Sequence, residues 1–118
     1  MLPSPHRLTD GASFQLAVRT GRRAGSRTLV VHLADDGAAA AERPPRIGFV
    51  VSKAVGNSVV RNRVKRRLRH LAREHVSSLP GSAVLVVRAL PAAADAATAE
   101  LAADLARCLH RVSAEVSR

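Results

Sequence analysis

The chain has 118 residues, which fits one domain (residues 1–118). Its formal net charge of +10 and sequence pI near 11.7 indicate that its partner is a polyanion such as nucleic acid. No apolar run reaches the ~18 residues that span a membrane, and the start MLPSPHRLTD lacks the apolar core of a signal peptide, so we expect a cytoplasmic protein with no membrane partner. The lone cysteine, Cys108, excludes an intrachain disulfide and a cysteine-based zinc site, and we expect it to be a packed helix residue.

The first predicted element is a helix over residues 10–19. Thr9 is a suitable N-cap, and Phe14 and Val18 share one face at a spacing of four residues. The segment TGRRAGSR (20–27) that follows is basic and turn-rich, with room for a short edge strand.

Two strands are predicted next, TLVVHL (28–33) and RIGFVVS (46–52), because both are rich in β-branched residues. The alternation leaves open which face of the sheet His32 occupies. Between the strands, ADDGAAAAERPP (34–45) reads as a flexible low-complexity loop. Asp35 lies in this loop and has no partnered carboxylate at a catalytic spacing.

The second half of the chain predicts helix, strand and helix. The first of these helices begins at Asn57 or Ser58, either of which can cap it, and runs to about His75 before SSLPG ends it. SAVLVVRAL (82–90) is almost wholly apolar, as expected of a strand buried on both faces. The last helix has an apolar stripe of Leu101, Leu105, Leu109 and Val112.

Seven Lys and Arg residues and no acid lie within GNSVVRNRVKRRLRHLAR (56–73). On a helical wheel, the apolar residues Val60, Val64, Leu68 and Leu71 gather on one side, and the cations fill most of the rest. Like charges at this spacing repel, which is tolerable if phosphates neutralise them on binding. Arginine outnumbers lysine, and its planar fork bonds phosphate oxygens bidentately. A merely solvated face would alternate in sign.

The aromatic residues, the histidines and the lack of a nucleophile motif limit the classes of function that fit the chain. The chain has two Phe and no Tyr or Trp, so a base-stacking platform is not expected. The five histidines show no metal-ligand spacing, and no nucleophile motif is present, so we expect no protein metal site and no small-molecule substrate. Two binding classes remain: a protein of structured RNA, such as a ribosomal protein, and a DNA-binding module. A DNA reader needs base-contacting side chains on one recognition face, whereas this helix is basic over most of its arc.

The segment RIGFVVSKAVGNSVVRNRVKRRLRHLAR resembles the signature of the bacterial ribonuclease P protein component, in which a strand leads into SKxxGxAxxRNRxKR. RLTDGASFQLAVRTGRR and AVLVVRALP resemble the start and the last strand of the same family. The resemblance covers nearly the whole chain in the right order. The residues that match the RNR segment are Ser52, Lys53, Gly56, Asn57, Arg61, Asn62, Arg63, Lys65, Arg66 and Arg69.

The resemblance implies an RNA-binding subunit of a ribonucleoprotein endonuclease that removes the 5′ leader from precursor tRNA. The RNA subunit would perform the chemistry with Mg²⁺ that it mainly holds, and no residue of the polypeptide would be catalytic. The implied contacts with the RNA subunit are those of the RNR helix: Arg61, Asn62, Arg63, Lys65, Arg66, Arg67 and Arg69. The implied cleft for the precursor tRNA leader comprises Phe14, Val18, His32, Lys53, Arg61 and Lys65.

The fold that the resemblance implies is an α+β, α-β-β-β-α-β-α two-layer sandwich with a mixed four-stranded sheet. Its β-α-β crossover would be left-handed, against the usual preference. The chain departs from the family pattern at Val18 and His32, where aromatic residues are common, and at Ala54, where a second lysine is common. Shape and charge would therefore carry more of the leader contact than stacking does.

Overall fold

The computed structural model describes residues 19, 21–35, 45–79 and 83–116. The described helices and strands are, in chain order, β1 (Arg22–Gly25), β2 (Leu29–Asp35), β3 (Arg46–Val50), α2 (Ser58–Arg73), β4 (Ala83–Ala89) and α3 (Thr98–Val116), with 3₁₀ turns at Val76–Ser78 and Pro91–Ala94.

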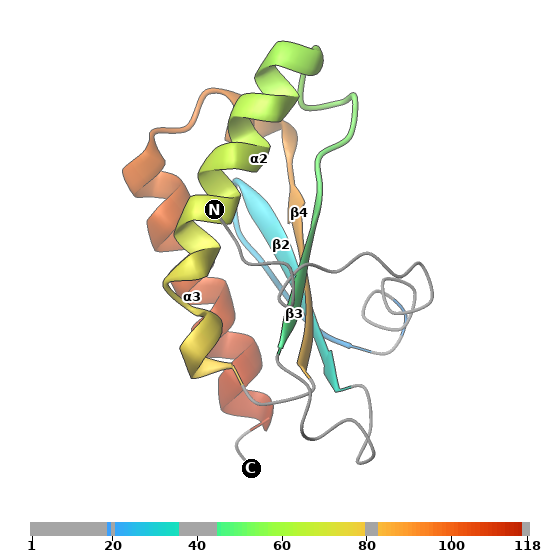
Figure 1. The fold of residues 1–118 in the computed structure, drawn as a ribbon, viewed down its shortest axis with the longest axis vertical. Helices are drawn as coiled ribbons and strands as arrows, with labels where there is room; N and C mark the ends of the chain where they lie inside the picture. Colours follow the sequence, from blue (N-terminus) through green and yellow to red (C-terminus); the bar gives the residue numbers. More distant parts are fainter. Residues whose placement is uncertain (1–18, 20, 36–44, 80–82, 117–118) are drawn as a thin grey trace.

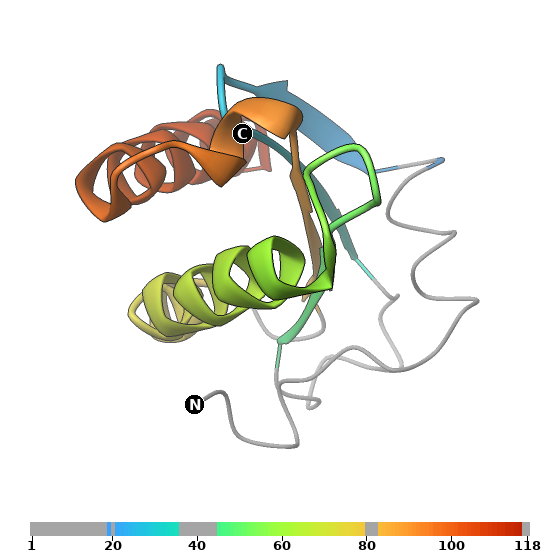
Figure 2. The ribbon, with the colours of Figure 1, turned by 90° about the horizontal axis from the view of Figure 1, so that it is seen from above.

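The four strands form one mixed sheet in the order β1-β2-β4-β3. β2 pairs antiparallel with β1 and with β4, while β3 pairs parallel with β4. Figures 1 and 2 show α2 and α3 side by side on the same face of this sheet, which gives two layers. The predicted α+β class with a mixed four-stranded sheet is therefore confirmed, and β1 is the edge strand expected within residues 20–27.

The connection from β3 through α2 to the parallel strand β4 is left-handed. With both strands pointing up and α2 toward the viewer, β4 lies to the left of β3, as the two views together show (Figures 1 and 2). Right-handed crossovers are the rule for such units, so the handedness follows the family resemblance and could not come from the pattern of apolar residues.

Alternation along the strands divides the sheet into a helix-covered face and an opposite face. Leu29, Val31 and Leu33 of β2 point into the main core with α2 and α3, whereas the side chains between them point the other way. β4 is buried on both faces, as its apolar sequence predicts. The predicted stripe of α3 is likewise confirmed, since its four residues are buried in the main core: Leu101, Leu105, Leu109 and Val112.

Some predictions lie partly or wholly outside the described residues. The helix expected at 10–19 is outside them except for Arg19, which is helical. Most of the loop predicted at 34–45 is outside as well. Its first two residues do not belong to a loop: β2 continues to Asp35, which pairs with Ala83 of β4. The low-complexity composition obscured this end of the strand because alanine and aspartate are poor strand formers.

Polar contacts hold α3 against the β1–β2 turn. The buried Thr28 hydroxyl donates to the buried Asp104 carboxylate at 2.5 Å. On the surface, Arg27 forms a bidentate pair with Glu100 at 2.7 and 2.8 Å. The first contact matters more for the position of α3, because loss of Thr28 would leave the Oδ2 atom of the buried Asp104 without its donor, while Oδ1 keeps Arg107.

The start of α2 is fixed by Asn57 and Gly56. The Asn57 side chain accepts a hydrogen bond from the Val60 backbone N–H at 3.0 Å, so Asn57 rather than Ser58 is the cap. A Cβ atom at Gly56 would lie 2.9 Å from Val60 Cγ1, whereas a Cβ at Gly25 in β1 would lie an ordinary 3.7 Å from its nearest neighbour, Val30 Cγ2.

Gly56→Ala is expected to lower the free energy of unfolding by about 1–3 kcal/mol, because Val60 is β-branched and can yield little. Gly25→Ala is the matched control and should stay within about 0.5 kcal/mol of the parent protein. Urea unfolding followed by circular dichroism measures both. Equal midpoints for the two variants would show that the turn before α2 has room for a side chain.

Candidate nucleic-acid interface

α2 combines a buried apolar stripe with a cationic outer arc. Val64, Leu68 and Leu71 are buried against the sheet and α3, as the helical wheel predicts, and Val60 is half-buried. The first turn contains no acid. Anchored in this way, the helix cannot rotate its charges inward, so the repulsion between them remains on the surface. The exposed members of the predicted RNA-binding set are Asn62, Arg63, Arg66 and Arg69.

The other members of that set are half-buried. Arg67 does not project freely into solvent as the wheel suggests: its Nη1 donates to the Ala96 carbonyl oxygen at 3.4 Å, just before α3 begins. The Arg61 Nε is buried and has no hydrogen-bond partner among the described residues. Lys65 lies one turn after Arg61 and is half-buried too. Helical spacing alone cannot show that α3 packs closely enough to take a side chain from the exposed arc.

His32 lies on the sheet face opposite the helices, which resolves the question that its strand left open. The ring is buried, with 5% of the residue exposed. Arg23 is its direct partner on β1, and Arg88 lies one diagonal step away on β4, two residues beyond His32's partner Val86. Desolvation by burial lowers the pKa of His32, and the nearby guanidinium groups of Arg23 and Arg88 lower it further.

The predicted site residues therefore fall on two sides of the sheet. α2 packs on the sheet face to which Leu85 and Val87 of β4 contribute. His32 lies on the other face, together with Val86, so the sheet separates it from the helix that carries the arginines. Lys53 is exposed in the turn between β3 and α2. Phe14 and Val18 lie outside the described residues.

Arg23 and Arg88 are two neighbours of His32 that the sequence did not single out as site residues. Both are exposed and lie on the same face as the histidine. Arg88 stands out in the sequence as the one charged residue of an apolar strand, and that was the available signal. Its proximity to His32 depends on the register of β2 against β4, which no local pattern specifies.

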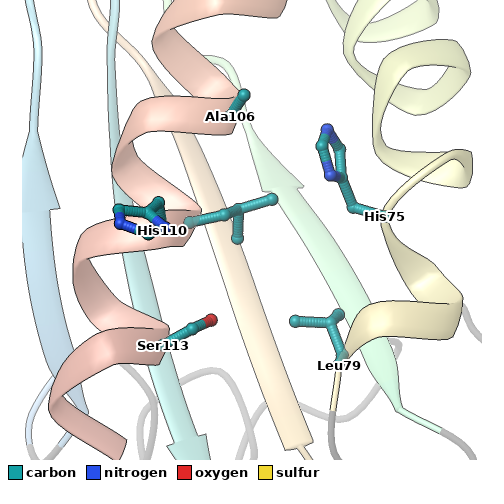
Figure 3. A pocket seen from close by; sticks show the side chains of 6 residues that line it. His75, Leu79, Ala106, His110 and Ser113 are labelled. Carbon is teal, nitrogen blue, oxygen red and sulfur yellow. The ribbon is translucent and has the colours of Figure 1, made fainter.

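Other features of the described residues are limited. A hollow of about 260 Å³ lies between the end of α2 and α3, and Figure 3 shows the His75 ring directed into the space between the helices. Over residues 19, 21–35, 45–79 and 83–116, no three His, Cys, Asp or Glu side chains are grouped as a metal site would require. None of the helices described is both long and apolar enough for a membrane span. Cys108 is fully buried, as expected.

Comparison with known sequences matches nearly the whole chain. The profile of the family described as Ribonuclease P matches residues 2–113. The chain is 71% identical over 117 residues to the ribonuclease P protein component of Nocardioides sp., with 99% of both chains covered. It is 56% identical to the protein of the same description from Streptomyces avermitilis, with 95% of both chains covered. A ribosomal-type or DNA-binding role is not favoured by these relatives.

Comparison with solved structures agrees with the sequence matches. A mutant ribonuclease P protein from Staphylococcus aureus superposes with a TM-score of 0.80 at 29% identity, covering 92% of this chain and 88% of the other. The ribonuclease P protein of Thermotoga maritima in complex with 1-(4-fluorophenyl)-2-thiourea has a TM-score of 0.72 at 22% identity, covering 86% and 94%, and supports the fold alone. The sequence match, the sheet order and the basic helix agree, and the chain belongs to the ribonuclease P protein family.

Proposed function

We propose that this chain, an RNA-binding protein component of the endoribonuclease ribonuclease P, contacts the enzyme's RNA subunit through α2 and the 5′ leader of precursor tRNA through the opposite face of the sheet. It acts in the cytoplasm, and the RNA subunit performs the cleavage. The observation that carries the proposal is the outer arc of α2, where arginines follow one another without an acid from residue 61 to residue 73.

The contact with the RNA subunit follows from the chemistry of that arc. Arg63, Arg66 and Arg69 are exposed, and the packed stripe on the other side of α2 holds them at fixed positions. A folded RNA presents closely spaced phosphates, and guanidinium groups bind phosphate oxygens in pairs of hydrogen bonds. Binding would remove the repulsion between neighbouring arginines, so the binding free energy would include relief of that repulsion as well as the new contacts.

The leader contact is assigned to the face that carries His32. Lys53, Arg61 and Lys65 are the cations proposed to border it, together with Phe14 and Val18 of the segment that precedes the described residues. Arg61 starts from α2, on the other side of the sheet from His32, so its place at the border of the leader site is carried by the family resemblance. Its half-buried guanidinium has one nitrogen, Nε, without a partner among the described residues. Single-stranded RNA bound here would meet cations and small apolar side chains rather than a stacking platform.

Mg²⁺ is proposed to stay with the RNA subunit, because the described residues do not fit it. Mg²⁺ prefers carboxylate oxygens and keeps several of its waters. The exposed arc of α2 carries no carboxylate, and a dense set of guanidinium groups repels a divalent cation. The polypeptide's contribution is thus to bind and orient RNA, with no step of the cleavage assigned to its side chains.

Arg66→Ala is expected to weaken assembly with the RNA subunit by about 1–3 kcal/mol, as a lost charge-assisted contact, whatever the leader length. Phe14→Ala should leave assembly nearly unchanged. If a leader base rests on the ring, this variant should reduce the preference of the assembled enzyme for precursor over mature tRNA by about 1–3 kcal/mol. Two titrations per variant, one of the RNA subunit and one of precursor tRNA, measure these effects.

The matched control for Arg66→Ala is Arg107→Ala, which removes an exposed arginine from α3 instead of α2. Its assembly with the RNA subunit should resemble that of the parent protein. Equal effects of Arg66→Ala and Phe14→Ala in both titrations would contradict the assignment of two separate RNA surfaces. Folding of each variant is checked by circular dichroism before titration.

A further inference from the structure

His32 is an unusual residue for the centre of a sheet. Its ring is buried, yet neither Nδ1 nor Nε2 has a hydrogen-bond partner within the described part of the chain. Buried polar side-chain atoms almost always have a partner, because an unpaired one keeps the penalty of leaving water. A phenylalanine or tyrosine ring would fill the same space without two unpaired ring nitrogens. The imidazole therefore points to an interaction that the described residues do not make.

The surroundings of His32 indicate which chemical group would satisfy it. Within the described residues, the charged side chains that face it are Arg23 from β1 and Arg88 from β4, and both are exposed. The neighbours on its own strand, Val30 and Ala34, are uncharged. Two guanidinium groups on either side of a ring N–H form a site for an anion with several acceptor oxygens, such as a phosphate group of RNA.

In the free protein this arrangement disfavours a proton on the ring. Burial removes the water that would stabilise an imidazolium, and the two arginines repel it, so the pKa of His32 is lowered and the neutral ring is favoured. A phosphate between Arg23 and Arg88 reverses the sign of the local charge. It cancels the repulsion and accepts a hydrogen bond from the ring, and both effects favour the protonated form.

We propose that Arg23, His32 and Arg88 form a phosphate-binding subsite for RNA on the sheet face opposite the helices, and that filling this subsite is coupled to uptake of a proton by His32. The inference rests on the proposed function, since the leader RNA is the phosphate source that it names. It goes beyond that function in one respect: bound RNA would favour protonation of His32, and protonation of His32 would favour RNA binding.

The direction of the pH dependence follows from linkage. The ring binds a proton more tightly when the phosphate is present, so the RNA binds more tightly when the ring is protonated. Affinity for leader-bearing RNA should therefore rise as the pH falls through the pKa of the complex, and it should level off below the pKa of the free protein. One proton sets the limit of the slope at about tenfold per pH unit.

The test counts protons. Isothermal titration calorimetry measures the binding of precursor tRNA to the assembled enzyme at about pH 6.3, just below the usual histidine pKa of about 6.5. Repeating the titration in buffers of different ionisation enthalpy gives the number of protons taken up on binding. The parent protein should take up more protons with precursor tRNA than with mature tRNA, which lacks the leader. His32→Phe should abolish that difference while it retains binding. His110→Phe, which changes an exposed histidine of α3, should retain it.

Arg88→Gln provides a second variant that leaves the buried ring in place. It should lower the affinity for precursor tRNA and reduce the proton uptake together. An unchanged proton difference in His32→Phe would overturn the inference, as would a preference for precursor tRNA in the parent protein with no proton uptake. If precursor and mature tRNA bind equally well to the parent enzyme, the proposed leader contact itself fails, and the two failures are thereby distinguished.

Discussion

Raising the monovalent salt concentration from about 50 to about 200 mM is expected to weaken binding of the RNA subunit roughly 250- to 1,000-fold. The estimate assumes that about six phosphates are neutralised, which gives a slope of roughly −4 to −5 in log K against log salt. The structural reason is the outer arc of α2, where the cations have no acidic partner within the helix and are proposed to be neutralised by phosphates of the RNA. Filter binding or fluorescence anisotropy across a salt series measures the slope.

A triple variant locates the source of that slope. Replacing the exposed Arg63, Arg66 and Arg69 with glutamine should flatten the slope by about 2–3, one lost counterion release for each residue. Arg107→Gln, Arg27→Gln and Arg111→Gln together remove the same charge from α3 and the β1–β2 turn, and they should change the slope little. A slope near −1 in the parent protein would mean that α2 is not the interface.

The RNA-free polypeptide is expected to leave precursor tRNA uncleaved, whereas the protein combined with its RNA subunit and Mg²⁺ should remove the leader. The reason is the chemical character of the described residues: their guanidinium and ammonium groups suit phosphate binding rather than proton transfer, and the buried acid Asp104 is engaged with Thr28. Hydrolysis of a phosphodiester needs a positioned base or a metal-bound water. The proposed division of labour assigns that requirement to the RNA.

The assay uses labelled precursor tRNA and protein freed of RNA by nuclease treatment and denaturing chromatography, then refolded. The protein with added RNA subunit is the positive control, and the RNA subunit alone at high Mg²⁺ reports what the RNA does by itself. Leader removal by the RNA-free protein at the site used by the complete enzyme would contradict the assignment. Activity that disappears on further purification would indicate a contaminating nuclease.

The sequence predicts α2 well because its apolar residues repeat at helical spacing and its caps are local. Val64, Leu68 and Leu71 are buried as expected, and Asn57 caps the first turn. The same reasoning misplaced Arg67, because its bond to Ala96 depends on how closely the start of α3 approaches. Helical periodicity describes one helix in isolation, so it cannot show which exposed residue a neighbouring element will cover.

The sheet face opposite the helices shows more clearly what the sequence could not predict. Alternation along a strand places His32 on one of two faces but does not say which, because both its neighbours, Val31 and Leu33, and its alternate residue Val30 are apolar. Its environment is decided by register, which sets Arg23 opposite it and Arg88 diagonal to it. Register and strand order arise from long-range packing, and the left-handed crossover entered only through the family resemblance.

The position of β4 at the centre of the sheet also affects how the protein is made. β2 and β3 both pair with β4, and the chain must extend 47 residues beyond Asp35 before the first residue of β4 is synthesised. At typical elongation rates this takes roughly 2–10 s. During that interval the apolar edge of β2 has no partner on its β4 side and is open to intermolecular strand pairing. The acid-free α2 is translated within the same interval, and its positive charge makes incomplete chains repel one another until β4 closes the sheet.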